Sequence, residues 1–403
     1  MNIQDNIVEE NAGDAKFAIN NMVKLIYLDN AATTKVDKKV FEAMKPYFIE
    51  EYGNPSSQHS LGMQSKEAIE KARKIIATNI NARPEEIFFT SGGTEANNWA
   101  LKELYFINAP LGKKHIIISK IEHPSIIEVC KMLEKLGARI TYLDVNKEGF
   151  IDMEQLNNAI SEDTLAISII HGNNEIGTIQ DIEAIGALCK EKKIYFHIDA
   201  CQSYGKAKID VVEQNINLAT LNGHKIHGPK GIGALYIRQG TKIAPFINGG
   251  GHERGMRSGT ENVPGIMGFA EAVKLFNEKD IRNMTNIRDY TLKKILGIKN
   301  VRINGSLKNR LCNNINVSFS NIEGEAIQRK LQEFGIMIST GSACASNSLK
   351  KSHVLKAIGL NDLEINSSIR VSLSKFTTKK EVDYFIKKLN IVVEELREMS
   401  PFA

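Results

Sequence analysis

The sequence of 403 residues predicts a three-layer α/β fold followed by a smaller α+β domain. Between about residues 85 and 240, short runs rich in β-branched residues alternate with amphipathic helical segments. That alternation is typical of a mostly parallel sheet with helices on both faces. Toward the C-terminal end the order changes to a strand, a helix, a small polar stretch, another strand and a long final helix.

The strands predicted for the first part follow one another in the order EIFFTS, KHIIISK, RITYLDV, LAISII, IYFHID, LATLNG and GALYIR. Segments such as PSIIEVCKMLEKLG and DIEAIGALCKEKK lie between them and have helical periodicity. In parallel sheets of this kind, ligands bind beyond the C-terminal ends of the strands. The polar residues that follow each run are therefore the first candidates for chemistry.

The C-terminal part is predicted from NINVSFS, EGEAIQRKLQEFG, SSIRVSLS and a final helix TKKEVDYFIKKLNIVVEELREM. A boundary falls near ENVPGIMG. We expect an N-terminal extension over residues 1–24, a large α/β domain over 25–265 and a small α+β domain over 266–403. Residues 1–21 are either a short disordered extension or a misassigned start, because Met22 opens a second plausible N-terminus.

Composition limits the class of protein. Hydrophobic residues make up 42% and charged residues 25%, and the net charge is +5, which is small for this length. No basic stripe with interleaved aromatics argues for direct nucleic-acid binding. No run of about 18 uncharged apolar residues predicts a membrane span. The five cysteines are widely spaced without a CxxC pair, which fits a reducing cytoplasm better than a disulfide framework or zinc site.

A lysine and an aspartate stand where a carbonyl coenzyme would need them. Asp199 ends the run IYFHID, and Lys225 follows the run LATLNG. Lysine forms Schiff bases with carbonyl cofactors, and pyridoxal-phosphate (PLP) enzymes pair such a lysine with an acid for the ring nitrogen. Taken singly, Lys225 is better explained as a surface lysine and Asp199 as a helix cap, and only the further motifs favour the coenzyme site.

Other strand ends carry polar groups that suit the same ligand. In TSGGTEANN a glycine turn, with Gly93 and Thr94, opens a helix whose N-terminus is a natural phosphate seat. Asn174 follows LAISII and can donate to a phenolate, or form an Asx turn. His123 precedes a proline-initiated helix and can stack on a ring and move protons, or be structural. His224 can add a phosphate donor.

With these stretches the chain resembles the cysteine desulfurases of the NifS/IscS family, within the aspartate-aminotransferase-like fold-type I PLP enzymes. The resemblance is carried, in order, by YLDNAATT, TSGGTEANN, EHPS, HGNNEIG, HIDACQS, GHKIHGPKGIGALY, GGGHERGMRSGTENV, STGSACAS and SSIRVSLS. These stretches span residues 27 to about 374.

The resemblance implies a role for each matching residue. Lys225 would hold PLP covalently, Asp199 would pair with the ring nitrogen, and His123 would stack on the ring and shuttle protons. Gln202 and Asn174 would contact the phenolate oxygen.

Further roles concern the phosphate and the substrate. Thr94 and His224 would bind the phosphate, beside Gly93. Thr260 would reach the phosphate of the neighbouring subunit, which implies a homodimer. Arg370 would bind the substrate carboxylate, for which a bidentate guanidinium is suited.

The resemblance also places the sulfur chemistry on Cys344, in STGSACASNS. Its thiolate would take the sulfur of L-cysteine as a persulfide, release alanine, and pass the sulfur to an acceptor protein such as an iron–sulfur scaffold or a tRNA-thiolation enzyme. The other interpretation is an inert loop thiol. Two positions depart from the family pattern: Asn222 stands where Ser or Ala is common, and Cys201 where Thr or Val is common.

Three other functions remain open at this point. A selenocysteine lyase or other β-lyase needs the same PLP site. A plain aminotransferase needs no loop cysteine. A catalytically silent sulfur carrier or assembly subunit would not need Lys225 and Asp199.

Overall fold

The computed structural model describes residues 25–340 and 351–399, and its largest sheet has seven strands in the order β2-β8-β7-β6-β5-β3-β4. Strands β3 to β7 run parallel, whereas β8 is antiparallel to both β7 and β2. Each strand coincides with one of the runs expected from the sequence: β2 (Ile87–Thr90), β3 (His115–Ser119), β4 (Arg139–Leu143), β5 (Thr164–Ile170), β6 (Tyr195–Asp199), β7 (Leu218–Asn222) and β8 (Gly233–Ile237).

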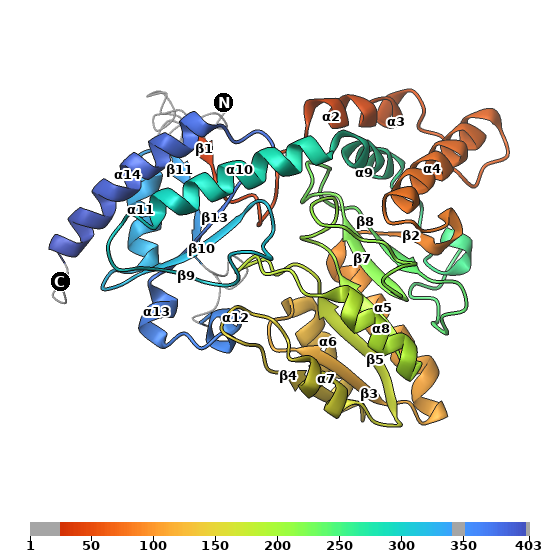
Figure 1. Ribbon diagram of the computed structural model, residues 1–403. Coiled ribbons are helices and arrows are strands. Elements are labelled where there is room, and N and C mark those ends of the chain that lie inside the picture. Colours follow the sequence, from red (N-terminus) through yellow and green to blue (C-terminus); the bar gives the residue numbers. More distant parts are fainter. Residues whose placement is uncertain (1–24, 341–350, 400–403) are drawn as a thin grey trace, which may run out of the picture.

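Helices cover both faces of this sheet, so the three-layer α/β prediction is confirmed (Figure 1). Successive side chains of a strand point to opposite faces. In β3, Ile116 and Ile118 pack with α5 (Gly93–Asn108) and α6 (Pro124–Lys135). Ile117 packs into the core on the other face, whose helices are α4 (Ser60–Asn79), α8 (Ile182–Lys192) and α9 (Val263–Leu275).

The C-terminal part has its own four-stranded antiparallel sheet, in the order β12-β13-β10-β9. Its strands are β9 (Val301–Ile303), β10 (Asn314–Phe319), β12 (Ser339–Thr340) and β13 (Ser368–Ser372). The apolar core beside it is filled from α10 (Glu278–Ile295), α11 (Gly324–Glu333) and α14 (Lys379–Glu398). Figure 1 shows this group on one side of the molecule and the seven-stranded sheet on the other.

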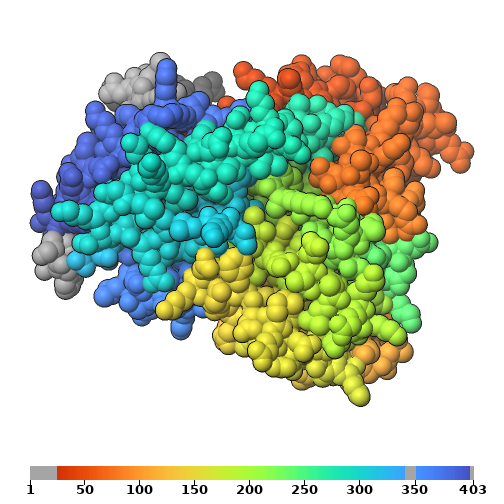
Figure 2. Space-filling model, in the orientation of Figure 1, coloured from red at the N-terminus to blue at the C-terminus, as the bar shows by residue number. Residues whose placement is uncertain are grey.

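Among the contacts between the described parts, two arrangements of whole strands and helices stand out. β1 (Ile26–Tyr27) pairs in parallel with β11 (Ile336–Met337), so the start of the described chain belongs by its packing to the C-terminal core. The short helices α12 (His353–Ala357) and α13 (Asp362–Asn366) pack on isoleucines at the strand ends of the large sheet. The two parts pack closely on the face drawn in Figure 2. The predicted domain limits stay a prediction.

The remaining helices are α2 (Lys38–Met44), α3 (Pro46–Ile49) and α7 (Met153–Ala159). In the part of the chain that the structure describes, no helix is long and apolar enough to cross a membrane. Nor do the same residues contain a cluster of three or more His, Cys, Asp or Glu side chains that could hold a metal ion.

Candidate active site

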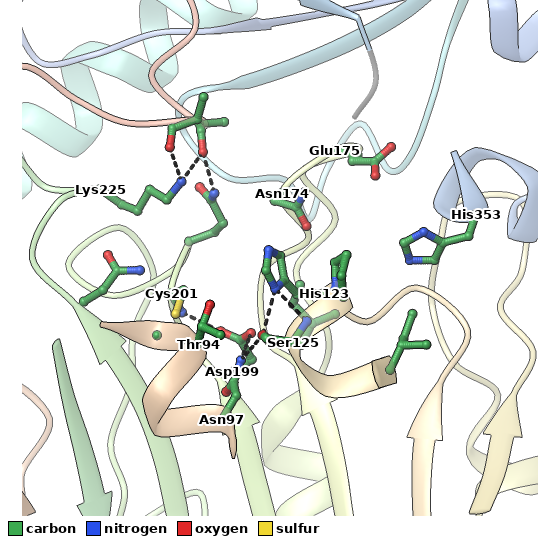
Figure 3. Close-up of a pocket in the computed structure, with 18 of the residues that line it drawn as sticks. Thr94, Asn97, His123, Ser125, Asn174, Glu175, Asp199, Cys201, Lys225 and His353 are labelled. Atoms are coloured by element: carbon green, nitrogen blue, oxygen red, sulfur yellow. Dashed lines mark hydrogen bonds between the residues drawn. The ribbon is translucent and has the colours of Figure 1, made fainter. Parts of the chain in front are cut away.

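A cavity of about 720 Å³ lies beyond the C-terminal ends of β5, β6 and β7, where the sequence placed the chemistry (Figure 3). Nine of the expected site residues line it: Gly93, Thr94, His123, Asn174, Asp199, Gln202, His224, Lys225 and Arg370. Thr260 is exposed and does not line this cavity. Cys344 lies outside the described residues.

Lys225 sits in the loop after β7 and reaches across the cavity to the segment that follows β1. Its Nζ donates to the carbonyl oxygens of Ala31 and Ala32 at 2.5 and 2.6 Å. Gln202 donates from Nε2 to the Ala31 carbonyl at 2.9 Å. These contacts show what the YLDNAATT stretch does here: its backbone carbonyls hold the lysine amine at the cavity wall.

Asp199 is the last residue of β6 and is 2% exposed. Its Oδ1 accepts from the backbone N–H of Cys201 at 2.9 Å, and its Oδ2 accepts from Asn97 Nδ2 at 2.8 Å. Each carboxylate oxygen can accept more than one hydrogen bond. The carboxylate is therefore held firmly and keeps acceptor capacity for a ligand in the cavity.

His123 is the N-cap of α6 and also lines the cavity. Its Nδ1 accepts from the backbone N–H of Ser125 at 3.1 Å and lies 2.8 Å from Ser125 Oγ. Burial lowers the pKa of His123, and the positive charge of Lys225 adds to this effect while Asp199 opposes it. These surroundings therefore favour the neutral form of the ring.

The N-terminus of α5 forms the part of the cavity that suits an anion. Gly92, its N-cap, has no side-chain capping bond, so the first N–H groups of the helix are left for a ligand. A Cβ on Gly93 would lie 2.3 Å from Cys201 Sγ, so the close approach of this turn requires glycine. The buried Oδ1 of Asn222 lines the same region and has no hydrogen-bond partner among the described residues.

His224 lines the same cavity and has a neutral ring. Its Nδ1 is 3.1 Å from Thr33 Oγ1. Burial, reinforced by the positive charge of Lys225, lowers the pKa of His224 to about 3. A neutral imidazole can donate one hydrogen bond to an anion without bringing a charge.

Arg370 comes from β13 of the C-terminal sheet and is 2% exposed. Its Nη2 donates to Asp29 Oδ1 at 2.9 Å, and its Nη1 donates to the backbone carbonyl of Asn174 at 3.1 Å. Its Nε has no partner among the described residues. A buried guanidinium that lines the same cavity as the lysine is suited to a carboxylate ligand.

The opposite rim is made by the first residue of α12 and by its N-cap, Ser352. Ser352 Oγ donates to Glu175 Oε2 at 2.5 Å, and His353 Nε2 donates to the backbone carbonyl of Glu122 at 2.9 Å. Burial raises the pKa of Glu175 to about 7 and that of Glu122 to about 8. Ser352 and His353 thus fasten the chain that follows the Cys344 stretch to the large sheet.

The segment that carries Thr260 is anchored away from the cavity. Arg73 and Glu253 form a buried bidentate ion pair, with Nη1–Oε2 and Nη2–Oε1 distances of 2.7 and 2.8 Å. Arg257 pairs with Glu95 on α5. These pairs hold residues 253–260 in place and leave Thr260 facing outward.

Sequence reasoning missed several of these groups. They are Asp29, Asn97, Ser125, Glu175, Ser352 and His353. Asn97 stands three residues after Thr94 on the same helix, and this spacing places both on one side of α5. Glu175 and Ser125 lie inside stretches already quoted for the resemblance, but only the packed structure shows their contacts.

The cavity fits a phosphorylated aldehyde coenzyme by its donor set. It combines a lysine amine, a buried carboxylate and a helix N-terminus that no side chain caps. The Aminotransferase class-V family model matches residues 26–385. The chain belongs to the aminotransferase class-V family. Within that family it groups with the NifS/IscS cysteine desulfurases, so the resemblance seen in the sequence is confirmed.

Curated relatives match almost end to end. The cysteine desulfurase IscS of Dictyoglomus turgidum is 48% identical over 94% of this chain and 98% of its own length. The cysteine desulfurase IscS of Methanosarcina thermophila is 49% identical over 94% of this chain and 95% of its own.

Solved structures agree with these relatives. A NifS-like protein superposes with a TM-score of 0.87 at 38% identity, covering 92% of this chain and 100% of its own. SspA in complex with cysteine superposes with a TM-score of 0.79 at 41% identity, covering 88% of this chain and 100% of its own.

Proposed function

We propose that this chain is a PLP-dependent cysteine desulfurase, which converts L-cysteine to L-alanine and transfers the sulfur to Cys344. The observation that carries the proposal is the meeting of Lys225, Asp199 and Arg370 around one cavity. A lysine amine, a buried carboxylate and a buried guanidinium are the groups that an amino-acid substrate and a carbonyl coenzyme require.

The residues at the N-terminus of α5 would bind the coenzyme's phosphate. Lys225 would bind its carbonyl carbon, and Asp199 would pair with its ring nitrogen. Thr94, His224 and the N–H groups that begin at Gly93 would bind the phosphate. Bound PLP would supply a carbonyl for the substrate amine and a ring that withdraws electrons from Cα.

On the substrate side, Arg370 would bind the carboxylate, since its guanidinium lines the cavity and its two Nη atoms are already oriented. Lys225 would exchange a proton at Cα when its amine is free. Asn174 and Gln202 line the wall next to it and would orient the ring. His123 would stack on the ring and take part in proton exchange.

The sulfur step involves Cys344. The Cys344 thiol attacks the substrate sulfur, the carbon–sulfur bond of cysteine breaks, and a proton replaces sulfur on the carbon. The products are alanine and a persulfide on Cys344, so atoms and electrons balance without an external oxidant. The persulfide would then pass to an acceptor protein, such as an iron–sulfur scaffold or a tRNA-thiolation enzyme.

The proposal includes the assembly and the setting. The outward-facing Thr260 would bind the coenzyme phosphate in the site of a second copy of the chain. The protein would then be a homodimer with shared sites. Four cysteines in the described part of the chain are free thiols, namely Cys130, Cys189, Cys201 and Cys312. Free thiols persist in a reducing compartment, which supports work in the cytoplasm.

The test supplies L-cysteine and a reductant to the purified protein and measures alanine and sulfide in parallel. We expect both products in equal amounts, and loss of sulfide in Cys344→Ser and in Lys225→Ala. Only Lys225→Ala should also lose the visible absorbance of the covalently bound coenzyme. Lys230→Ala, which changes an exposed lysine of the same loop, is the matched control.

Two results would contradict the proposal. Full sulfide production by Cys344→Ser would show that no Cys344 persulfide is needed, and would favour a simple β-lyase. Faster selenide release from selenocysteine than sulfide release from cysteine, at matched concentrations, would favour a selenocysteine lyase.

A further inference from the structure

A continuous chain of buried hydrogen bonds connects Asp199 to His123. Asn97 Nδ2 lies 2.8 Å from Asp199 Oδ2 and 2.8 Å from Ser125 Oγ. Ser125 Oγ in turn lies 2.8 Å from His123 Nδ1. Asn97 is 1% exposed and Ser125 9%, so water has little access to these contacts. Figure 3 draws the contacts as dashed lines.

The direction of each bond follows from what each group can donate. The Asp199 carboxylate only accepts, so Asn97 must present its NH₂ group to it. The second hydrogen of that NH₂ group goes to Ser125 Oγ, which leaves the Ser125 hydroxyl hydrogen for His123 Nδ1. The Asn97 carbonyl oxygen is turned away and has no partner among the described residues.

A second donor acts on the same ring atom. The backbone N–H of Ser125 donates to His123 Nδ1 at 3.1 Å, which caps α6. A backbone N–H can only donate, so Nδ1 is an acceptor on both counts. The hydrogen of the neutral ring therefore sits on Nε2.

The charges around His123 favour this neutral form. Burial lowers its pKa, with Lys225 and His353 acting in the same direction and Asp199 against them. The N-terminus of α6 adds a partial positive charge. A neutral imidazole held at a helix N-terminus can act as a hydrogen-bond donor without first being protonated.

We propose that Asn97 and Ser125 are positioning residues that hold His123 as a neutral ring with its hydrogen on Nε2, so that it presents a donor to the cavity. This inference rests on the proposed function. It limits the role of His123 to that of a hydrogen-bond donor from Nε2. In this state Nε2 cannot accept a proton, so the acceptor at Cα is the amine of Lys225. Asn97 also ties the position of His123 to that of the Asp199 carboxylate.

Nitrogen-15 NMR of the histidine-labelled holoenzyme tests the tautomer directly, with the His123 signals assigned from their loss in His123→Gln. We expect the neutral Nε2–H form in the unaltered protein. In Ser125→Ala and in Asn97→Ala we expect a measurable fraction of the Nδ1–H form. The same variants should lose about tenfold in kcat, with KM changed less than threefold, and Ser125→Thr, which keeps the hydroxyl, should restore both readouts.

Asn98→Ala is the matched control, because among the described residues the Asn98 side chain bonds only to the Thr94 carbonyl of its own helix. It should leave the His123 tautomer and kcat unchanged. An Nδ1–H or doubly protonated His123 in the unaltered protein at neutral pH overturns the proposal. So does an unchanged tautomer, or full activity, in both Ser125→Ala and Asn97→Ala. The tautomer is read without turnover, so failure of the desulfurase assay would leave this test standing.

Discussion

The cavity wall built by the seven-stranded sheet differs from the wall built by the C-terminal sheet in how its side chains are held. On the first wall Asp199, Asn97, Ser125 and His123 bond to one another in a buried chain. On the second wall Arg370 bonds to Asp29, which lies beside β13, and across the cavity edge to the backbone of Asn174. One wall is internally fixed, and the other depends in part on a contact between the two parts.

This difference suits one wall to binding the coenzyme and the other to binding the substrate. A coenzyme that stays bound through many turnovers is best served by donors and acceptors that keep their positions without it. A substrate that arrives and leaves is better served by a guanidinium that lines the cavity. The comparison predicts that changes on the first wall reduce kcat most, and changes on the second wall mainly raise KM.

The largest effect is expected for Asp199→Asn. Loss of the carboxylate removes the charge that would stabilise a protonated ring nitrogen, and we expect kcat to fall on the order of 100- to 1,000-fold. Steady-state kinetics of alanine formation measures this. Asp181→Asn, at the exposed N-cap of α8, is the control, because asparagine also caps helices well. A change confined to KM would show that Asp199 acts on substrate binding instead.

A smaller effect, of a different kind, is expected for Arg370→Lys. An ammonium cannot reproduce bidentate carboxylate binding, so KM for L-cysteine should rise roughly 10- to 100-fold, while kcat changes less. Arg302→Lys on β9 of the same sheet, whose guanidinium pairs with Glu364, should leave both constants unchanged. If Arg370→Lys lowered kcat and left KM intact, the contrast between the walls would fail.

The smallest effect concerns Glu122, whose backbone carbonyl accepts from His353 where the walls meet. Burial raises the pKa of its carboxyl from 4.5 to about 8. Between these pH values the folded protein binds a proton that the unfolded chain has lost, so stability falls as pH rises through this window. Glu122→Gln removes this titration.

Thermal unfolding at pH 6 and pH 9 checks the Glu122 prediction. Tm should fall with rising pH in the unaltered protein and fall less in Glu122→Gln. Because burial also raises the pKa of Glu175, some pH dependence should remain in the variant. The exposed Glu148→Gln should behave like the unaltered protein. Parallel pH curves for Glu122→Gln and the unaltered protein would show that Glu122 is already charged in the folded state.

The sequence was informative where local pattern decides the structure. Asp199 and Lys225 follow apolar runs, and parallel strands bring their C-terminal ends to one edge, so their meeting could be predicted. The contacts of Asn97 with Ser125 could not, because they depend on how α5 packs against α6. The carbonyls that hold Lys225 come from residues nearly 200 positions away, and no local pattern marks such a pairing.

The most direct measurement of the central claim is mass spectrometry of the holoenzyme after one equivalent of L-cysteine, without reductant or acceptor. The account predicts one additional sulfur atom on the peptide that contains Cys344 and an equal amount of alanine. Alanine formed without additional sulfur on that peptide, or with sulfur on the Cys201 peptide instead, would contradict it.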